Sequence, residues 1–281
     1  MRTILNCAYH MKFPVRSILV KSAQAFAVSA ASLMLSVSAS AFQPLTTDDT
    51  GMQASGGNQV EFSLNEDRAK ALGKVELLRS LPIVYTRGLT DALDVFTGLS
   101  YAWVRPASAG SNASGSGSPS FGAKWRFFAG EESKTSFALK PEVLLPAGDD
   151  RDGAGLGTGK TSGRLTLILT RELPFGAIHI NAGVSRDRYR NTLNNPDTTT
   201  KRFSIAPVWD LKGQWKLAFD LGAESAYQGD AKIRSNSIQL GAIYSPSKDL
   251  DFALGALCAS DNASPRTNKR AATAGITWRF R

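Results

Sequence analysis

Apolar and polar residues alternate with a period of two along most of the chain, most clearly over residues 215–227. The odd positions there are mostly apolar, whereas Lys216, Asp220 and Glu224 occupy even positions. A period of two is typical of a β-strand, but this stretch far exceeds the roughly five or six residues of an ordinary strand. Aromatic residues stand at both ends of the apolar face, and charges stand in the middle of the other. This pattern predicts a strand that crosses a bilayer between lipid and a polar lumen.

Eleven further segments repeat this alternation. Their apolar faces begin at Val60, Leu77, Leu93, Phe121, Phe137, Leu165, Ile178, Phe203, Ile238, Leu250 and Ala272. The second segment fits least well, because Arg79 interrupts its apolar face and Pro82 has no N–H for a neighbouring strand. Short turns near residues 88, 131, 174, 213 and 247 alternate with longer loops near 70, 112, 153, 194, 231 and 264. We place the charged stretches 65–74 and 228–234 among the longer loops.

An even number of strands, with short turns at one end and long loops at the other, is the pattern of bacterial outer-membrane barrels. The predicted fold is therefore all-β, a 12-stranded antiparallel transmembrane β-barrel over residues 58–281, with both termini in the periplasm. All five tryptophans fall on the predicted lipid-facing side, mostly near strand ends, where such rings meet the membrane interface. They are Trp103, Trp125, Trp209, Trp215 and Trp278.

The N-terminus has the features of a cleaved signal peptide spanning residues 1–41. Four basic residues precede a short apolar run at residues 25–37, and the small residues Ala39 and Ala41 fit a cleavage site. Met11 is a second candidate start, and an uncleaved anchor helix is the alternative interpretation. Residues 42–57 are polar and show no period. We assign them to a periplasmic N-terminal segment, which either hangs free or enters the mouth of the barrel.

Composition agrees with an exported barrel without a spanning helix. After the first forty of the 281 residues, no apolar run reaches the length of about eighteen that a membrane helix needs. Removing residues 1–41 takes away four cations and no anions, so a net charge of +9 becomes +5. An exported chain is not expected to bind nucleic acid. Cys7 leaves with the signal peptide, so Cys258 has no partner for an internal disulfide.

The inward positions carry charges of both signs, which predicts a polar lumen with cross-strand ion pairs. Twelve tilted strands give a backbone diameter of roughly 24 Å, which side chains narrow to a path of about 5–10 Å or close. We expect either a small-solute pore with a charged constriction or a plugged barrel. The candidate lumen and constriction residues are Lys124, Arg126, Lys140, Glu142, His179, Lys216, Asp220 and Glu224.

Basic residues also crowd the predicted outer rim, where they could pair with phosphates of lipopolysaccharide or remain solvated. They are Arg68, Lys70, Lys74, Arg105, Arg186, Arg188, Arg190, Lys201, Arg202, Lys232, Arg234, Lys269 and Arg270.

Three motifs suggest other chemistry but lack essential parts. Residues 154–161 resemble a phosphate-binding loop, yet a strand follows them rather than a helix. Outer-membrane phospholipases place a histidine and a serine two residues apart on the outer face, whereas His179 and Asn181 are predicted to face inward. The acids at 149, 150 and 152 lack the remaining spacing of a calcium loop. We therefore predict no enzyme activity, no metal and no cofactor.

Five segments carry a resemblance to a known family: 42–49 (FQPLTTDD), 57–61 (GNQVE), 81–91 (LPIVYTRGLTD), 140–149 (KPEVLLPAGD) and 155–160 (GLGTGK). Together they resemble the "MetA-pathway of phenol degradation" group of outer-membrane barrels, over nearly the whole mature chain. The C-terminus resembles the signal read by the barrel-assembly machinery, although Arg281 follows the terminal aromatic Phe280.

The resemblance implies a bacterial outer-membrane channel or transporter. It would pass small solutes, aromatic or hydrophobic ones among them, by diffusion, with loops 106–119 and 146–160 gating entry. The alternatives are an outer-membrane lipid hydrolase and a closed structural or adhesive barrel that displays its loops.

Overall fold

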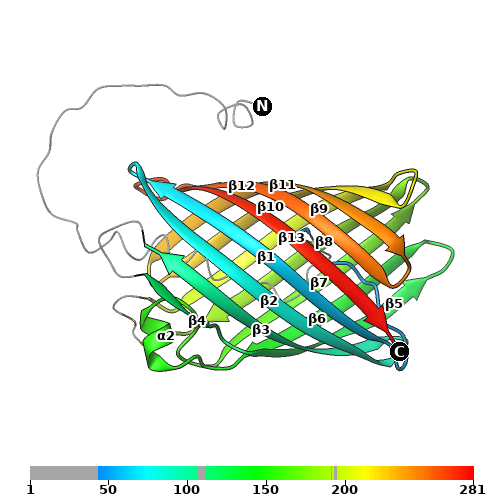
Figure 1. Ribbon diagram of the computed structural model, residues 1–281, viewed down its shortest axis with the longest axis horizontal. Coiled ribbons are helices and arrows are strands. Elements are labelled where there is room, and N and C mark those ends of the chain that lie inside the picture. The colour runs from blue at the N-terminus through cyan, green and yellow to red at the C-terminus, as the bar shows by residue number, and fades with distance from the viewer. Residues whose placement is uncertain (1–43, 107–111, 191, 193–194) are drawn as a thin grey trace, which may run out of the picture.

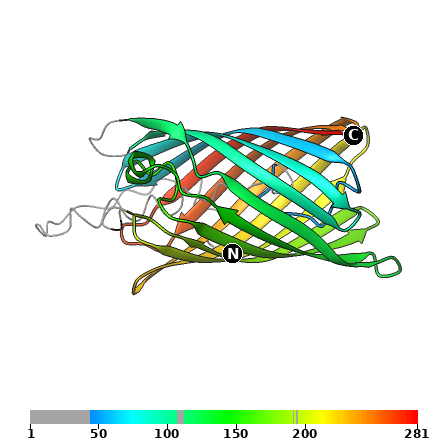
Figure 2. The ribbon, with the colours of Figure 1, turned by 90° about the horizontal axis from the view of Figure 1, so that it is seen from below.

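The computed structural model describes residues 44–106, 112–190, 192 and 195–281. They form one antiparallel sheet that closes on itself, because β2 pairs with both β1 and β3. Figures 1 and 2 show tilted strands wound around a central axis. The strands are β1 (Asn58–Ala71), β2 (Lys74–Thr90), β3 (Leu93–Arg105), β4 (Ala113–Ser116), β5 (Ser120–Gly130), β6 (Thr135–Leu144), β7 (Ser162–Leu173), β8 (Gly176–Asp187), β9 (Thr198–Asp210), β10 (Trp215–Gln228), β11 (Ala231–Ser247), β12 (Leu250–Asp261) and β13 (Asn268–Phe280).

The thirteen strands make a twelve-stranded barrel, because β4 and β5 occupy one position in the wall. The first half of β3 pairs with β5, from Leu93 opposite Trp125 to Gly98 opposite Ser120. Its second half pairs with β4, from Tyr101 opposite Ser116 to Val104 opposite Ala113. The predicted twelve-stranded antiparallel barrel is confirmed.

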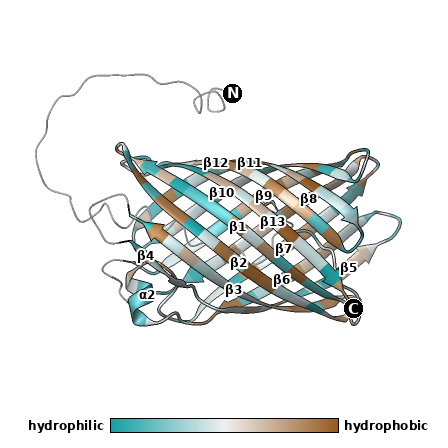
Figure 3. Ribbon diagram, viewed as in Figure 1, coloured by the Kyte–Doolittle hydropathy of each residue, from teal (hydrophilic) through white to brown (hydrophobic). Residues whose placement is uncertain are grey.

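The wall is apolar outside and polar inside. Large apolar side chains remain exposed on the outer face, for example Leu254 at 64%, Leu99 at 60% and Trp125 at 52%. Polar residues are buried within, including Ser204 at 0% and Asp220 at 1%. Figure 3 shows apolar and polar residues alternating along the strands. A soluble protein would not expose an apolar belt of this extent, so the outer face is a lipid-facing surface.

Two stretches predicted as long loops, 65–74 and 228–234, are instead strand and tight turn, and that prediction is wrong. β1 runs to Ala71 and β2 starts at Lys74, and Gly229 and Asp230 alone separate β10 from β11. The alternation here involves charged residues rather than apolar ones. Outward Glu66 pairs with Arg79 at 2.9 Å, and inward Asp67 pairs with Lys269 at 2.9 Å. These hairpins extend the sheet beyond the apolar belt.

β2 shows how the two awkward residues of the second segment are accommodated. Arg79 faces outward and reaches Glu66, which lies directly opposite it on β1. The pairing of β2 with β1 skips Leu81 and Pro82, while Pro82 still lies opposite Ser100 of β3. The missing N–H of the proline therefore falls at an interruption of the ladder.

The two ends of the barrel differ in the length of their connections. At the end of the barrel where the C-terminus lies, each turn has two residues, such as Asp91–Ala92 and Pro174–Phe175, or four, such as 131–134. The opposite end carries the long connections, including the one that contains the short helix α2 (Asp149–Gly153). No helix in the described part of the chain is long and apolar enough to cross a membrane.

Residues 44–57 lie inside the barrel and contact its inner wall, and they join β1 at the end of the short turns. Of the two placements left open by the sequence, the structure therefore shows the one within the barrel. The predicted signal peptide, residues 1–41, lies outside the described residues.

Candidate functional site: the lumen and its N-terminal segment

The segment of residues 44–57, which we call the lumen segment, crosses the interior from one side of the wall to the other. It starts against β10 and β11, where Gln239 Nε2 donates to the carbonyl oxygen of Pro44. It ends beside β2, where the N–H of Gly56 donates to the carbonyl oxygen of Gly88 at 3.0 Å. The segment has no regular secondary structure, so its backbone polar groups depend on side chains of the wall.

Asp220 of β10 binds the first part of the lumen segment. Its Oδ2 accepts hydrogen bonds from the N–H of Thr46 at 3.0 Å, the hydroxyl of Thr46 at 2.9 Å and the N–H of Thr47 at 2.8 Å. The hydroxyl of Thr47 donates to Ser204 Oγ of β9 at 2.7 Å. A charged acceptor with several donors is among the stronger hydrogen-bonded arrangements, so Asp220 fixes this part of the segment.

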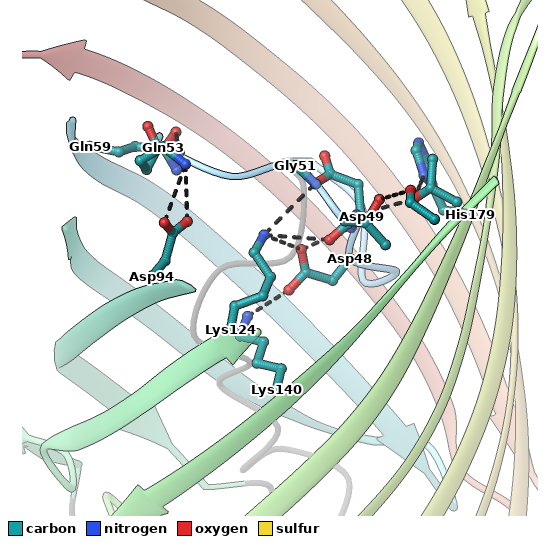
Figure 4. A network of polar contacts seen from close by, with 12 residues as sticks. Asp48, Asp49, Gly51, Gln53, Gln59, Asp94, Lys124, Lys140 and His179 are labelled. Atoms are coloured by element: carbon teal, nitrogen blue, oxygen red, sulfur yellow. Dashed lines mark hydrogen bonds and ion pairs between the residues drawn. The ribbon is translucent and has the colours of Figure 1, made fainter. Parts of the chain in front are cut away.

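Asp48 forms the centre of the network in Figure 4. Its Oδ2 accepts a hydrogen bond from Lys140 Nζ of β6 at 2.6 Å, and its Oδ1 lies 3.7 Å from Lys124 Nζ of β5. With the Asn181 amide in the orientation that satisfies both of its polar atoms, its nitrogen donates to the carbonyl of Asp48 at 2.9 Å and its oxygen accepts from the Asp48 N–H at 2.7 Å. These side chains are largely buried, so the ion pairs are weakly screened by water.

Asp49 also lies beside Lys124, with 3.8 Å between Asp49 Oδ1 and Lys124 Nζ. Burial alone would raise the pKa of Asp49, but Lys124, His179 and the N–H of Gly51 together hold the pKa below its ordinary value. The Asp49 carboxylate is therefore charged at neutral pH, and the lumen segment presents two adjacent anions to the lysines of the wall.

The last part of the lumen segment is bound by β3 and by the turn that precedes it. The N–H of Gln53 donates to Asp94 Oδ2 at 3.1 Å, and the N–H of Ser55 donates to Asp91 Oδ1 at 3.0 Å. Between the two anchored parts, the N–H of Thr50 donates to Thr170 Oγ1 of β7 at 3.1 Å. The segment is thus held by polar contacts to several strands and, where it begins, by a small apolar cluster of Leu45 with Ala206, Val208 and Ala218.

A cavity of about 150 Å³ lies beside the lumen segment. Its lining includes five carboxylates and three cations, which gives it an acidic surplus. The carboxylates are Asp48, Asp49, Glu61, Asp94 and Asp251, and the cations are Lys124, Lys140 and Arg279. In the described residues, no group of three or more side chains is arranged to hold a metal ion.

The eight residues predicted to line the lumen do not form one constriction. Lys124, Lys140 and Asp220 bind the lumen segment directly. Glu142 lies near Arg164, with 3.7 Å between the charged atoms, and Glu224 pairs with Arg202 at 3.1 Å.

The other three predicted residues lie nearer the short-turn end or make local contacts. Arg126 donates to the carbonyl of Asp91 at 2.9 Å, and Lys216 pairs with Asp210 at 3.2 Å. His179 Nδ1 lies 2.9 Å from Thr170 Oγ1 inside the barrel, so the ring does not face lipid.

Sequence reasoning missed the partners that come from the lumen segment itself, above all Asp48 and Asp49. It also missed Arg164, which lies on the inner face of β7 next to Glu142. The sequence offers one indication of these partners, two adjacent acids, Asp48 and Asp49, in a segment that shows no alternation of apolar and polar residues. It does not indicate that their partners lie on β5 and β6.

An apolar patch covers the inner wall on the α2 side of the lumen segment. Leu78 of β2, Ala102 of β3 and Ala69 of β1 are buried against Leu156 of the α2 connection. Further along the same wall, Val84 packs on Phe96, and Lys140 Nζ lies 5.0 Å from the centre of the Phe96 ring. This side of the inner wall therefore carries two apolar clusters, one under the α2 connection and one beside Lys140.

An apolar outer belt, a closed even-numbered sheet, a polar interior and short turns at one end define a bacterial outer-membrane β-barrel. The comparisons with known proteins give the family. The family model described as "Putative MetA-pathway of phenol degradation" matches residues 78–280, and the chain belongs to this family. No curated protein sequence matches the chain.

Solved structures show the same fold at low sequence identity. The COG4313 outer membrane channel from Pseudomonas putida F1 aligns with a TM-score of 0.66 and 14% identity, over 84% of this chain and 100% of that one. The β domain of the Bordetella autotransporter BrkA aligns with a TM-score of 0.52 and 16% identity, over 80% and 100%. The NanC porin aligns with a TM-score of 0.51 and 7% identity, over 77% and 98%.

Proposed function

We propose that the protein is an outer-membrane channel that passes small solutes by diffusion, and that the lumen segment controls the path. The observation that supports this most directly is how the segment is held. It occupies the interior mainly through hydrogen bonds and ion pairs to β3, β5, β6, β7 and β10, with one small apolar cluster around Leu45 where the segment begins. Polar contacts of this kind exchange with water, so the segment can shift without unfolding the barrel.

The solutes we propose are small aromatic or hydrophobic molecules. The inner wall holds two buried apolar clusters, with Leu78, Ala102 and Leu156 near the outer end and Phe96 further in, which such a solute would contact once the α2 connection and the lumen segment shift. The family description, which refers to phenol degradation, points the same way. The stretch 106–119 was predicted as a loop but contains β4 of the wall, and the stretch 146–160 contains α2; we propose that these two stretches set access from outside.

We further propose that the protein is not an enzyme. His179 is the histidine that a lipid hydrolase would need, yet it contacts Thr170 within the lumen, and Asn181 binds the backbone of Asp48. A hydrolase would need both groups on the lipid side. The barrel-assembly machinery and the outer-leaflet lipopolysaccharide are the further partners expected from the location.

Planar-bilayer recordings test the channel. The chain without residues 44–55 should conduct ions several-fold better than the intact chain, because the lumen segment no longer fills the interior. Liposomes containing the shortened chain should also take up phenol faster than liposomes containing the intact chain. A barrel that folds but stays silent in both forms would favour a closed structural barrel. Lipid hydrolysis that disappears in a His179→Ala variant would favour the hydrolase.

A further inference from the structure

The outer rim of the barrel carries more positive charge than its ion pairs use. Four of the basic residues predicted at this rim form ion pairs: Arg68 with Glu66, Arg190 with Asp149, Arg202 with Glu224 and Lys269 with Asp67. Others lie on the outward face, at the end of the barrel that carries α2. Two groups of these outward cations can be compared, one on β1 and β2 and one on β9 to β11; Arg105, Arg186 and Arg270 lie on β3, β8 and β13.

The second group surrounds Tyr227 of β10. Lys232 of β11 lies opposite Tyr227, and its Nζ is 5.0 Å from the centre of the ring. Lys201 of β9 reaches the ring from the other side, with its Nζ at 5.7 Å. Arg234 and Lys201 both lie opposite Ser225, which faces outward like Tyr227. We call Lys201, Tyr227, Lys232 and Arg234 the Tyr227 patch.

The two groups differ in whether an acid neutralises them. In the first, Glu66 forms ion pairs with both Arg68 and Arg79. Across the described residues, by contrast, no carboxylate forms an ion pair with Lys201, Lys232 or Arg234. The cation–π contacts orient the two ammonium groups without cancelling their charge. Three adjacent cations therefore stay available to an external anion.

The patch lies at the level where lipid headgroups meet the barrel. Trp215 and Tyr227 mark the two ends of the outward face of β10. Twelve residues of strand, tilted as in other barrels, span a height of about 30 Å, which matches the hydrocarbon core of a bilayer. Phe203, 53% exposed, and Leu221, 43% exposed, face lipid below the patch.

From this placement we propose that the Tyr227 patch binds a phosphate group of lipopolysaccharide in the outer leaflet. A lipid A phosphate at this level would accept hydrogen bonds from Lys201, Lys232 and Arg234. Its acyl chains would lie along the apolar face of β9 and β10. This inference depends on the location in the outer membrane and not on solute passage.

The test measures lipid binding to the detergent-purified full chain by native mass spectrometry, with bisphosphorylated lipid A as the probe. The triple variant Lys201→Gln, Lys232→Gln, Arg234→Gln should bind roughly tenfold more weakly than the parent, through loss of charge-assisted hydrogen bonds. The matched control changes three basic residues at the opposite end: Arg171→Gln, Lys212→Gln and Lys248→Gln. It loses the same charge and should bind like the parent.

Dephosphorylated lipid A with the same acyl chains should bind the parent as weakly as bisphosphorylated lipid A binds the patch variant. Equal binding of the two lipids, or equal losses in the patch and control variants, would overturn the proposal. Single Lys201→Gln and Arg234→Gln variants, each with a partial loss, serve if the triple variant fails to fold. Bilayer conductance of the patch variant should match the parent, which separates this inference from the proposed channel.

Discussion

At the scale of single residues, the lumen segment depends on a few charged side chains, and Asp48 with Lys140 is the closest pair. Both side chains are about nine-tenths buried, and their charged atoms are 2.6 Å apart. A buried pair of this kind gives little net stability, but losing one partner leaves an uncompensated charge. The pair therefore acts as a latch between the segment and β6.

Replacing Lys140 by methionine tests this latch. The only cation left within 4 Å of the Asp48 carboxylate, among the ion pairs of the described residues, would be Lys124 at 3.7 Å. An uncompensated buried charge costs about 3–5 kcal/mol unless the group moves toward water. We expect the segment to leave its place more often, so that single-channel recordings show larger or more frequent openings. Lys216→Met is the control, because its exposed pair with Asp210 is worth roughly 1 kcal/mol or less. Identical recordings from the two variants would contradict the latch.

Gly88 shows how closely the lumen segment approaches the wall. A Cβ at Gly88 would lie 1.8 Å from the carbonyl oxygen of Ala54, so even alanine cannot be accommodated without moving the segment. Gly88→Ala should therefore increase proteolysis within residues 44–57 of the folded barrel. Gly163→Ala is the control, since a Cβ there would lie 3.8 Å from the carbonyl oxygen of Glu142, an ordinary van der Waals distance. Equal protection of both variants would show that the close approach does not position the segment.

At the scale of elements, the strands could be predicted where apolar residues alternate, and not where charged residues do. At the outer ends of β1 and β2 the side chains alternate just as strictly between the two faces of the sheet. There, however, both faces carry charged residues, with the ion pair Glu66–Arg79 on the outer face and Asp67–Lys269 on the inner face. These partners lie on other strands, so the sequence of one segment does not contain them. The lumen segment was unpredictable for the same reason, because the contacts that anchor it to β5, β6, β7 and β10 come from residues far away in the sequence.

The corrected β1–β2 hairpin gives a test of orientation. Leu72 and Gly73 form its tight turn, with φ of 47° and 79°, as a two-residue hairpin requires. An epitope inserted between them should be labelled by antibody on intact cells, because this end carries the long connections. The same epitope between Pro174 and Phe175 should be labelled only after the outer membrane is permeabilised. The reverse labelling pattern would mean that the barrel has the opposite orientation in the membrane.

At the scale of the whole molecule, the charges around the lumen determine which ions pass. The cavity beside the segment holds five carboxylates against three cations, and a field of one sign in a narrow space concentrates counter-ions. Under a potassium chloride gradient, the reversal potential should therefore show a preference for cations. Asp94→Asn should reduce that preference, since the amide oxygen can still accept from Gln53 but carries no charge. Glu224→Gln, whose partner is Arg202 outside this cavity, should change it less.

The tryptophan rings lie on the outer face of the barrel, and this placement predicts how their fluorescence responds to lipid and to water-soluble quenchers. Trp103, Trp125, Trp215 and Trp278 are each between 41% and 52% exposed on the outer face, and Trp209 stacks on Phe175 with 6.2 Å between ring centres. Rings at the edges of a lipid-facing belt contact acyl chains near the interface. Bilayers of lipids brominated near the headgroup should quench most of the tryptophan fluorescence, whereas iodide in the buffer should quench little of it. Strong quenching by iodide, together with none by brominated lipid, would mean that the rings face water. The outer face would then not be lipid-facing, and neither the proposed channel nor the proposed lipid site could stand.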